Sequence, residues 1–184
     1  MRRIDLPLEG ACLLEPNLHA DGRGFFFEAW NQRTLNSLGV DTGFVQENHS
    51  RSARGVLRGL HYQLGKPQGK LVRVLSGHIW DVAVDLRRDS PDFGRHAAFD
   101  LKPRNADGEL EMLWIPEGFA HGFLVLSEAA VVLYKTTDGY YPEGERCIRW
   151  NDPTLGIAWP LDTVAPAVSA KDALGCDFAA AELP

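Results

Sequence analysis

VLRGLHYQ at residues 56–63 and QGKLVR at residues 68–73 are short apolar runs of the kind that form β-strands. They also carry ionisable side chains, with Arg58 and His61 in the first run and Lys70 in the second. Such side chains are costly to bury and normally stay at the surface. A His that exchanges a proton near neutral pH, close to a Lys that stabilises an anion, indicates proton abstraction. The two runs therefore predict a polar site inside a β scaffold.

Similar strand-like runs recur along the chain, rich in Val, Ile, Leu and aromatic residues and separated by Gly, Pro, Asn and Asp. We expect strands at residues 11–14, 24–30, 44–46, 56–63, 70–75, 78–86, 96–101, 110–115, 121–126 and 130–137. The clearest alternation, at residues 79–86, places Trp80, Val82, Val84 and Leu86 on one face and Asp81 and Asp85 on the other. Many short strands with few helices indicate a β-sandwich or barrel.

One helix is expected, capped by Asn31, with Leu35 and Leu38 on one face and Gly39 at its end. The tail after Trp150 is rich in Pro and Asp and should wrap the surface with short helical turns. The length of 184 residues suits one domain with a substantial core, and no composition shift marks a boundary. We therefore expect a single domain over residues 1–184.

The charge balance limits the classes of partner. With 19 Lys and Arg against 25 Asp and Glu, the net charge is −6, which argues against nucleic-acid binding. A local basic pocket for an anionic ligand is still expected, from cations that lie close together in the sequence. These are Arg51, Arg54, Arg58, Lys66, Lys70 and Arg73.

The cysteines and apolar runs indicate the compartment. Cys12, Cys147 and Cys176 form no CxxC pair, so neither a zinc site nor a disulfide framework is expected. The N-terminal residues lack the apolar run of a signal peptide, and the longest apolar runs are too short to cross a bilayer. We expect a cytoplasmic protein with no membrane partner.

His61 is the sharpest candidate for a base. The cations Arg58 and Lys70 favour its neutral, proton-accepting form, although a purely structural histidine is the alternative. Strict alternation places Arg58 and His61 on opposite faces of the strand. A bulge or twist at Gly59 is therefore expected to bring both into one pocket.

Three further residues have both a functional and a purely structural interpretation. His121 is either a second pocket histidine or a buried histidine bonded to backbone, and Tyr134 is either a proton donor or a half-buried core tyrosine. Asp172 either orients His61, as a carboxylate fixes an imidazole tautomer, or belongs to a solvated charge cluster. A histidine-rich metal site needs about three or four ligands. The chain has no HxH pair, so we expect no metal.

Taken together, seven segments resemble one family in order along nearly the whole chain. They are DGRGFFFE (21–28), FVQENHS (44–50), VLRGLHYQ (56–63), QGKLVR (68–73), WIPEGFAHGF (114–123), LYKTT (133–137) and SAKD (169–172). The family is dTDP-4-dehydrorhamnose 3,5-epimerase, the third enzyme of dTDP-L-rhamnose synthesis. The resemblance implies an all-β, cupin-like double-stranded β-helix (jelly roll) with a few short peripheral helices. It also implies a homodimer with no metal or organic cofactor.

The resemblance further implies the reaction. The substrate would be dTDP-4-dehydro-6-deoxy-D-glucose, epimerised at C3 and C5 to dTDP-4-dehydro-L-rhamnose through enolates, since both carbons flank the C4 ketone. His61 would be the base with Asp172 as its partner, Tyr134 would return a proton from the opposite face, and Lys70 would stabilise the enolate oxygen. The implied substrate-binding residues are Arg23, Glu28, Gln46, Asn48, Arg58, Lys70, His121, Tyr140, Glu145 and Lys171. The strand that carries Arg23 and Glu28 would reach into the neighbouring subunit's pocket.

Two departures from the family pattern qualify these expectations. Gly139 precedes Tyr140 and Tyr141 where an aromatic residue is common, so Tyr140 is expected to stack on thymine, with Tyr141 as the alternative. Residues 102–109 are longer than the usual family loop and are expected to form a surface hairpin. Three alternative functions stay open: a single-carbon epimerase of a related sugar, a metal-dependent cupin oxygenase or isomerase, and a non-catalytic sugar-nucleotide-binding module.

Overall fold

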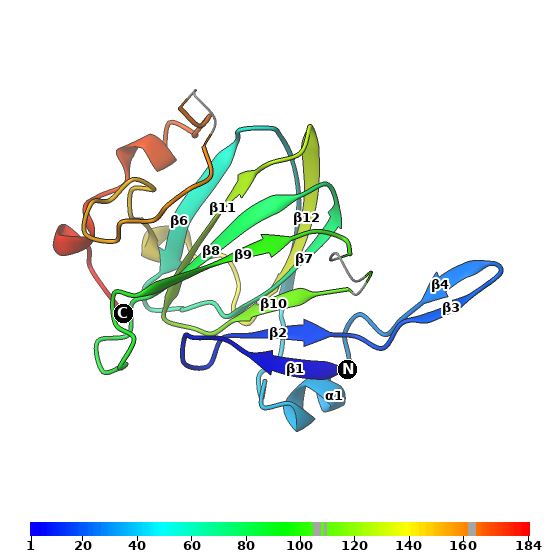
Figure 1. Ribbon diagram of the computed structural model, residues 1–184. Helices are drawn as coiled ribbons and strands as arrows, with labels where there is room; N and C mark the ends of the chain where they lie inside the picture. Colours follow the sequence, from blue (N-terminus) through cyan, green and yellow to red (C-terminus); the bar gives the residue numbers. More distant parts are fainter. Residues whose placement is uncertain (105–107, 109, 162–164) are drawn as a thin grey trace.

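Two antiparallel β-sheets face each other in the computed structural model, which describes residues 1–104, 108, 110–161 and 165–184 (Figure 1). The six strands of the first sheet lie in the order β1 (Arg2–Asp5), β2 (Cys12–Glu15), β10 (Met112–Ile115), β7 (Lys70–Ser76), β12 (Ala129–Thr136) and β5 (Gln46–Ala53). The five of the second lie in the order β13 (Glu145–Cys147), β6 (Leu57–Gln63), β11 (Phe119–Val125), β8 (Ile79–Asp85) and β9 (His96–Leu101). The predicted all-β jelly roll of the cupin type is confirmed.

The core between the sheets is formed by the inward positions of both. Val72 and Val132 from the first sheet pack with Ile79, Ala83 and Phe123 from the second. The alternation predicted for residues 79–86 is present in β8: Val82 and Val84 belong to a separate cluster on the outer face. Asp81, on the inward face, is fully buried. Both faces of this strand are therefore covered, and its carboxylate lies inside the protein.

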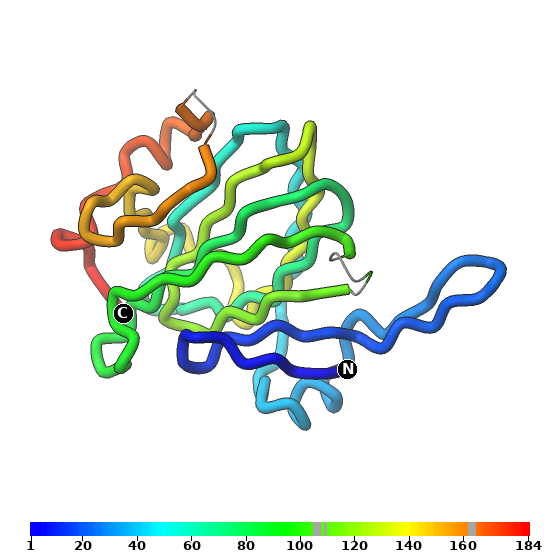
Figure 2. Tube along the Cα trace, in the orientation of Figure 1, coloured from blue at the N-terminus to red at the C-terminus, as the bar shows by residue number. Residues whose placement is uncertain are grey.

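Helical segments and loops cover the outer faces of the two sheets. Helix α1 (Gln32–Ser37) is capped by Asn31, whose side chain accepts from the backbone N–H of Arg33 at 3.0 Å, and Gly39 follows it with φ +78°. Leu35 of this helix packs on the outer face of the first sheet. The tail, with its 3₁₀ turns Asp172–Leu174 and Phe178–Ala180, covers the second sheet, as expected (Figure 2). A third 3₁₀ turn, Pro142–Gly144, precedes β13.

Several boundaries differ from the prediction. The run expected at 44–46 overlaps β5 only at Gln46, and the strand continues to Ala53. The strand expected at 24–30 is shorter: β4 (Gly24–Phe26) pairs with β3 (His19–Asp21) in a hairpin that projects from the sheets (Figure 1). The expected hairpin at 102–109 includes 105–107 and 109, which lie outside the described residues.

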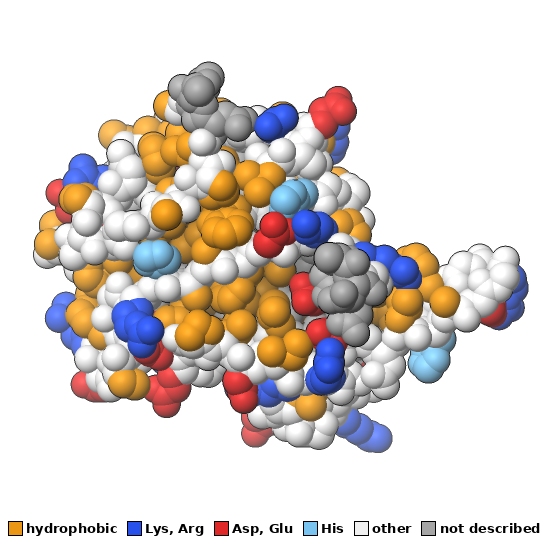
Figure 3. All heavy atoms as spheres, viewed as in Figure 1, with side chains coloured by type: hydrophobic (Ala, Val, Ile, Leu, Met, Phe, Trp, Pro, Cys, Tyr) orange, Lys and Arg blue, Asp and Glu red, His pale blue; other side chains and the backbone are white. Residues whose placement is uncertain are grey.

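The surface is mixed in character. In the view of Figure 3, apolar side chains gather over β8 and β9, while charged side chains lie mostly toward the periphery. Within the described part of the chain, no helix has both the length and the apolar character needed to cross a membrane.

Candidate active site

A cavity of about 360 Å³ lies between the sheets, where β5 and β12 of the first face β6, β11 and β13 of the second. Its size is in the range of small-molecule sites. Nine of the predicted site residues line it: Gln46, Asn48, Arg58, His61, Lys70, His121, Tyr134, Tyr140 and Glu145. Asp172 and Lys171 line an adjoining cavity, which shares Arg58, His61 and Glu145 with the first. The structure thus gathers eleven residues from distant segments.

His61 and Asp172 form a short contact at the site. The distance from His61 Nε2 to Asp172 Oδ1 is 2.6 Å, and the carboxylate is 3% exposed. Burial raises the pKa of the Asp172 carboxyl, but hydrogen bonds from His61 and from the Gly59 N–H outweigh it and hold the pKa below its ordinary value. Asp172 therefore stays ionised and orients the imidazole, which is the arrangement of a general base.

The predicted irregularity at Gly59 is present. His121 of β11 pairs with His61, whereas Phe123 pairs with Arg58, so the register shifts across this stretch of β6. Gly59 has φ +113°, and a Cβ there would lie 2.6 Å from both the Gly122 Cα and the His121 carbonyl oxygen. Only glycine fits this backbone approach. The shift brings Arg58 and His61 to the wall of one cavity.

Lys70 and Tyr134 enter the cavity from the sheet that faces His61. The Lys70 Nζ donates to the His61 carbonyl oxygen at 3.2 Å. Burial lowers the pKa of Lys70 to about 8, while Asp81 and Glu145 act to raise it. Burial also raises the pKa of Tyr134, against the effect of Arg58, so its phenol is protonated at neutral pH. The cavity thus holds an imidazole on one sheet, and a cation and a phenol on the other.

His121 has a partner that sequence reasoning missed. Its Nε2 lies 2.9 Å from both carboxylate oxygens of Asp81 on β8, and both side chains are buried. His121 is thus a cavity-lining histidine held by a carboxylate, and not one bonded to backbone as in the alternative interpretation. The sequence did carry a signal, because Asp81, like Asp85, breaks the apolar run of this strand.

The predicted binding residues at the mouth are linked to one another. The Gln46 side chain donates to Asn48 at 2.9 Å and accepts from the Tyr140 N–H at 2.9 Å. The Tyr140 hydroxyl donates to Glu145 at 2.5 Å, and Glu145 also pairs with Lys171. The Tyr140 ring is 55% exposed at the cavity mouth.

Tyr141, the alternative to Tyr140, is held elsewhere. Its N–H donates to the Gln63 side chain at 3.0 Å, and its ring lies under the Lys66 ammonium, 5.5 Å from the ring centroid. It is not among the residues that line the cavity. The geometry favours Tyr140 as the residue available to a ligand.

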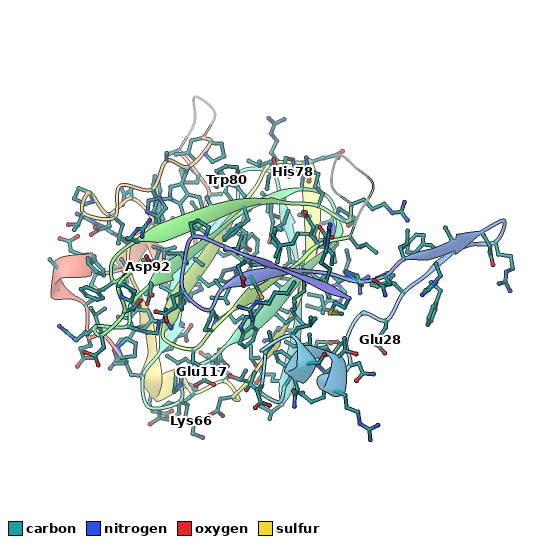
Figure 4. The ribbon with its side chains drawn as sticks, turned by 60° about the horizontal axis from the view of Figure 1, so that its bottom comes forward. Glu28, Lys66, His78, Trp80, Asp92 and Glu117 are labelled. Carbon is teal, nitrogen blue, oxygen red and sulfur yellow. The ribbon has the colours of Figure 1, made fainter. Side chains whose placement is uncertain are left out.

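Arg23 and Glu28 lie outside the cavity of this chain. Arg23, on the projecting hairpin, pairs with Asp21. Glu28 accepts from Asn31 at 2.8 Å and from Thr34 at 2.9 Å, beside α1 (Figure 4).

The expectation of one basic pocket from six cations is correct only for Arg58 and Lys70. Arg73 lies over the Phe27 ring instead, 4.7 Å from its centroid, because the alternation of β7 directs it to the outer face. Lys66 lies over Tyr141, and neither Arg51 nor Arg54 lines this cavity.

Sequence reasoning also missed three polar residues of the cavity wall, Ser50, Gln63 and Gln68. The two amides are held by backbone: Gln63 donates to the Lys66 carbonyl at 2.8 Å, and Gln68 donates to the Asp138 carbonyl at 2.8 Å. The buried Ser50 Oγ has no partner among the described residues.

One group of side chains has metal-ligand character. Ligand-type atoms of His61, Cys147 and Asp172 lie within 4.8 Å of one another. However, His61 Nε2 already contacts Asp172, and burial raises the pKa of the Cys147 thiol to about 12, with Asp172 adding to the shift. Because metals bind the thiolate, this chemistry does not favour a metal there.

Comparisons with known proteins agree with this geometry. The profile of the family described as dTDP-4-dehydrorhamnose 3,5-epimerase matches residues 5–180. A dTDP-4-dehydrorhamnose 3,5-epimerase from Pseudomonas aeruginosa is 55% identical over 183 residues, which are 99% of this chain and 98% of that protein.

Solved structures give the same result. The dTDP-6-deoxy-D-glucose-3,5-epimerase from Legionella pneumophila, in complex with dTDP-4-keto-L-rhamnose, has a TM-score of 0.92 and 43% identity, covering 100% of this chain and 97% of that one. A 3′-monoepimerase from Streptomyces bikiniensis, in complex with dTDP-quinovose, has a TM-score of 0.84 and 34% identity, covering 95% of this chain and 86% of that one.

Proposed function

Because the chain belongs to the dTDP-4-dehydrorhamnose 3,5-epimerase family, we propose that its cavity epimerises dTDP-4-dehydro-6-deoxy-D-glucose at C3 and C5. The product is dTDP-4-dehydro-L-rhamnose, and the enzyme is an isomerase of dTDP-L-rhamnose biosynthesis. The observation that carries the catalytic assignment is the His61–Asp172 pair, 2.6 Å apart, in one cavity with Lys70 and Tyr134. Base, anion stabiliser and acid are the three groups that inversion beside a ketone requires.

The roles follow from the chemistry of the ketone. His61 removes the proton from C3 or C5, and the electron pair of the broken C–H bond moves to the C4 oxygen, giving an enolate. The Lys70 ammonium stabilises the charge that develops on that oxygen. Tyr134 stands on the opposite sheet, so its phenol delivers a proton to the other face of the same carbon, which inverts it. Solvent then restores the protonation states of His61 and Tyr134.

The remaining cavity residues suit the nucleotide part of the substrate. The exposed Tyr140 ring at the mouth offers a flat apolar face to thymine. Arg58, whose Nε donates to Ser52 at 3.0 Å, keeps its remaining guanidinium donors for diphosphate oxygens. Lys171 adds a second cation beside Glu145.

We further propose that the active form is a homodimer in which the hairpin β3–β4 completes the partner's site. Arg23 and Glu28 match substrate-binding positions of the family, yet they lie outside the cavity of their own chain. Phe25 and Phe26 on this hairpin are exposed, as expected for a segment that a second copy covers.

Proton NMR of dTDP-4-dehydro-6-deoxyglucose in heavy water with the protein tests the function. Loss of both the C3 and C5 proton signals, with the rhamno product confirmed by a coupled reductase, is the expected result. Loss at one carbon alone would favour a single-carbon epimerase, the second candidate, because a 3′-monoepimerase shares this fold. Absence of exchange at both carbons would refute the epimerase proposal for this substrate. Activity that a chelator abolishes would instead indicate a metal-dependent cupin.

A further inference from the structure

Asp81 is a buried carboxylate next to the proposed active site, and the reaction steps above do not use it. Its side chain is 0% exposed and lies on the inward face of β8, between Ile79 and Ala83, which belong to the apolar core. A carboxylate in such surroundings is costly unless charged or hydrogen-bonding groups compensate it. The groups that compensate the Asp81 carboxylate therefore indicate its role.

The first neighbour is His121. Both Asp81 oxygens lie 2.9 Å from His121 Nε2. A carboxylate only accepts hydrogen bonds, so Nε2 must carry the proton, and in the neutral ring Nδ1 is then the acceptor. Asp81 thus fixes both the tautomer and the orientation of a ring that lines the cavity.

The second group that Asp81 affects is Lys70, whose buried side chain lines the same cavity as His121. Burial disfavours its charged form, and Asp81 is the first of two carboxylates that oppose this effect. The ionisable groups that line the cavity around Lys70 are Arg58, His61 and Tyr62 of β6, His121 of β11, Tyr134 of β12, Tyr140, and Glu145 of β13. Glu145 already pairs with Lys171 and Tyr140. Of the two carboxylates that act on Lys70, Asp81 is the one that is fully buried.

We propose that Asp81 is a positioning residue for the epimerisation: its carboxylate orients His121 and keeps the Lys70 ammonium charged inside the cavity. This inference rests on the proposed function, because it matters for catalysis only if Lys70 faces an enolate. Asp81 itself does not line the cavity, so it acts through His121 and Lys70, which do.

The first test needs no turnover. In protein labelled with ¹³C at lysine Cε, the Lys70 signal is assigned by its loss in Lys70→Arg and titrated against pH. Asp81→Asn, which preserves shape and removes the charge, should lower the Lys70 midpoint by about one pH unit or more. The matched control is Asp85→Asn, since Asp85 is equally buried on the same strand but pairs with Arg87 and Ser90. It should leave the midpoint unchanged, and an unchanged midpoint in Asp81→Asn would overturn the inference.

The second test is the rate of solvent deuterium exchange into the substrate. Asp81→Asn should lower kcat about 10- to 100-fold, as expected for a residue that orients an active-site histidine. KM should change far less, and the alkaline limb of the pH profile should move to lower pH. A residue with only a structural role would lower the thermal midpoint without moving that limb.

Asp81→Glu resolves the case in which Asp81→Asn does not fold. It keeps the charge and displaces the carboxylate, so the alkaline limb of the pH profile should stay at the wild-type pH while kcat falls. A shifted limb or a wild-type kcat would overturn the inference. Wild-type protein that shows no exchange would instead refute the proposed function, and the Lys70 titration would still report on the coupling to Asp81.

Discussion

Asp172→Asn is the most informative single substitution at this site. It preserves the shape of a side chain that is almost fully buried and removes its charge. The Asn oxygen still accepts from the Gly59 N–H, which contacts Asp172 at 3.4 Å. The Asn amide, however, can donate to His61 Nε2, and that favours the tautomer in which this nitrogen is no longer the donor.

The magnitude follows from the 2.6 Å contact between His61 and Asp172. Charge centres about 4 Å apart interact by about 4 kcal/mol at an effective dielectric constant of about 20. The His61 side chain is 32% exposed, so solvent screening reduces this to about 2–3 kcal/mol of stabilisation for the imidazolium that forms during proton abstraction. With the loss of the correct tautomer added, proton exchange should slow about 10²- to 10³-fold.

The assay is the disappearance of the substrate C3 and C5 proton signals in heavy water, measured at equal concentrations of folded protein. The matched control is Asp152→Asn, because Asp152 is also buried in the tail but accepts only from backbone N–H groups and lies near Arg149. It should lower the thermal midpoint and leave the exchange rate per folded molecule unchanged. An Asp172→Asn rate within about threefold of wild type would contradict the role of Asp172 in orienting the base.

Three further predictions concern the other groups. Tyr134→Phe should slow reprotonation more than deprotonation, so exchange should persist while inversion falls; unchanged inversion would mean another donor. Wild-type activity should decline as pH rises through about 8, because Lys70 loses its proton there and with it the cation needed at the enolate oxygen; a flat profile to pH 10 would argue against that role. Arg23→Ala and His61→Ala should each be inactive, yet their mixture should recover about a quarter of wild-type activity if the hairpin completes the partner's site; no recovery after subunit exchange would place Arg23 outside it.

Most strands were predictable because their apolar positions alternate or run continuously. Strands β1, β3 and β13 were not expected, and only the first residue of β5 was. Strand β5 is the most instructive of these. Its inward positions include Gln46, Asn48 and Ser50, which line the cavity, and its outward positions are exposed. A strand whose inward face is polar carries no hydrophobic period. The polar inward face that makes β5 part of the site is therefore also the reason that hydrophobic periodicity did not predict this strand.

The site itself was only partly accessible from the residues. His61 and Lys70 stood out because each breaks an apolar strand, but the contact of His61 with Asp172 joins residues 111 positions apart. Alternation and composition carry no information on such a pairing. The sequence offered Asp172 as a partner of His61 only beside the alternative of a solvated charge cluster, and the family resemblance favoured the pairing. The irregularity at Gly59 was partly predictable. Strict alternation places Arg58 and His61 on opposite faces, so an irregularity was needed to bring both into one pocket, and the register of β6 and β11 shifts there.

The distribution of polarity along the strands separates the core from the site and makes Asp81 exceptional. On β12 the inward positions pass from Val132 in the core to Tyr134 in the cavity, and on β7 they pass from Val72 to Lys70. Along these strands polar groups begin where the core ends, so they gain contact with a ligand. Asp81 breaks this rule: it pairs in register with Phe123 and is polar without access to the cavity. The buried Asp81 carboxylate is stable only because cationic and hydrogen-bonding groups at the cavity wall compensate it. Its removal should therefore change the titration of those groups more than it changes substrate binding.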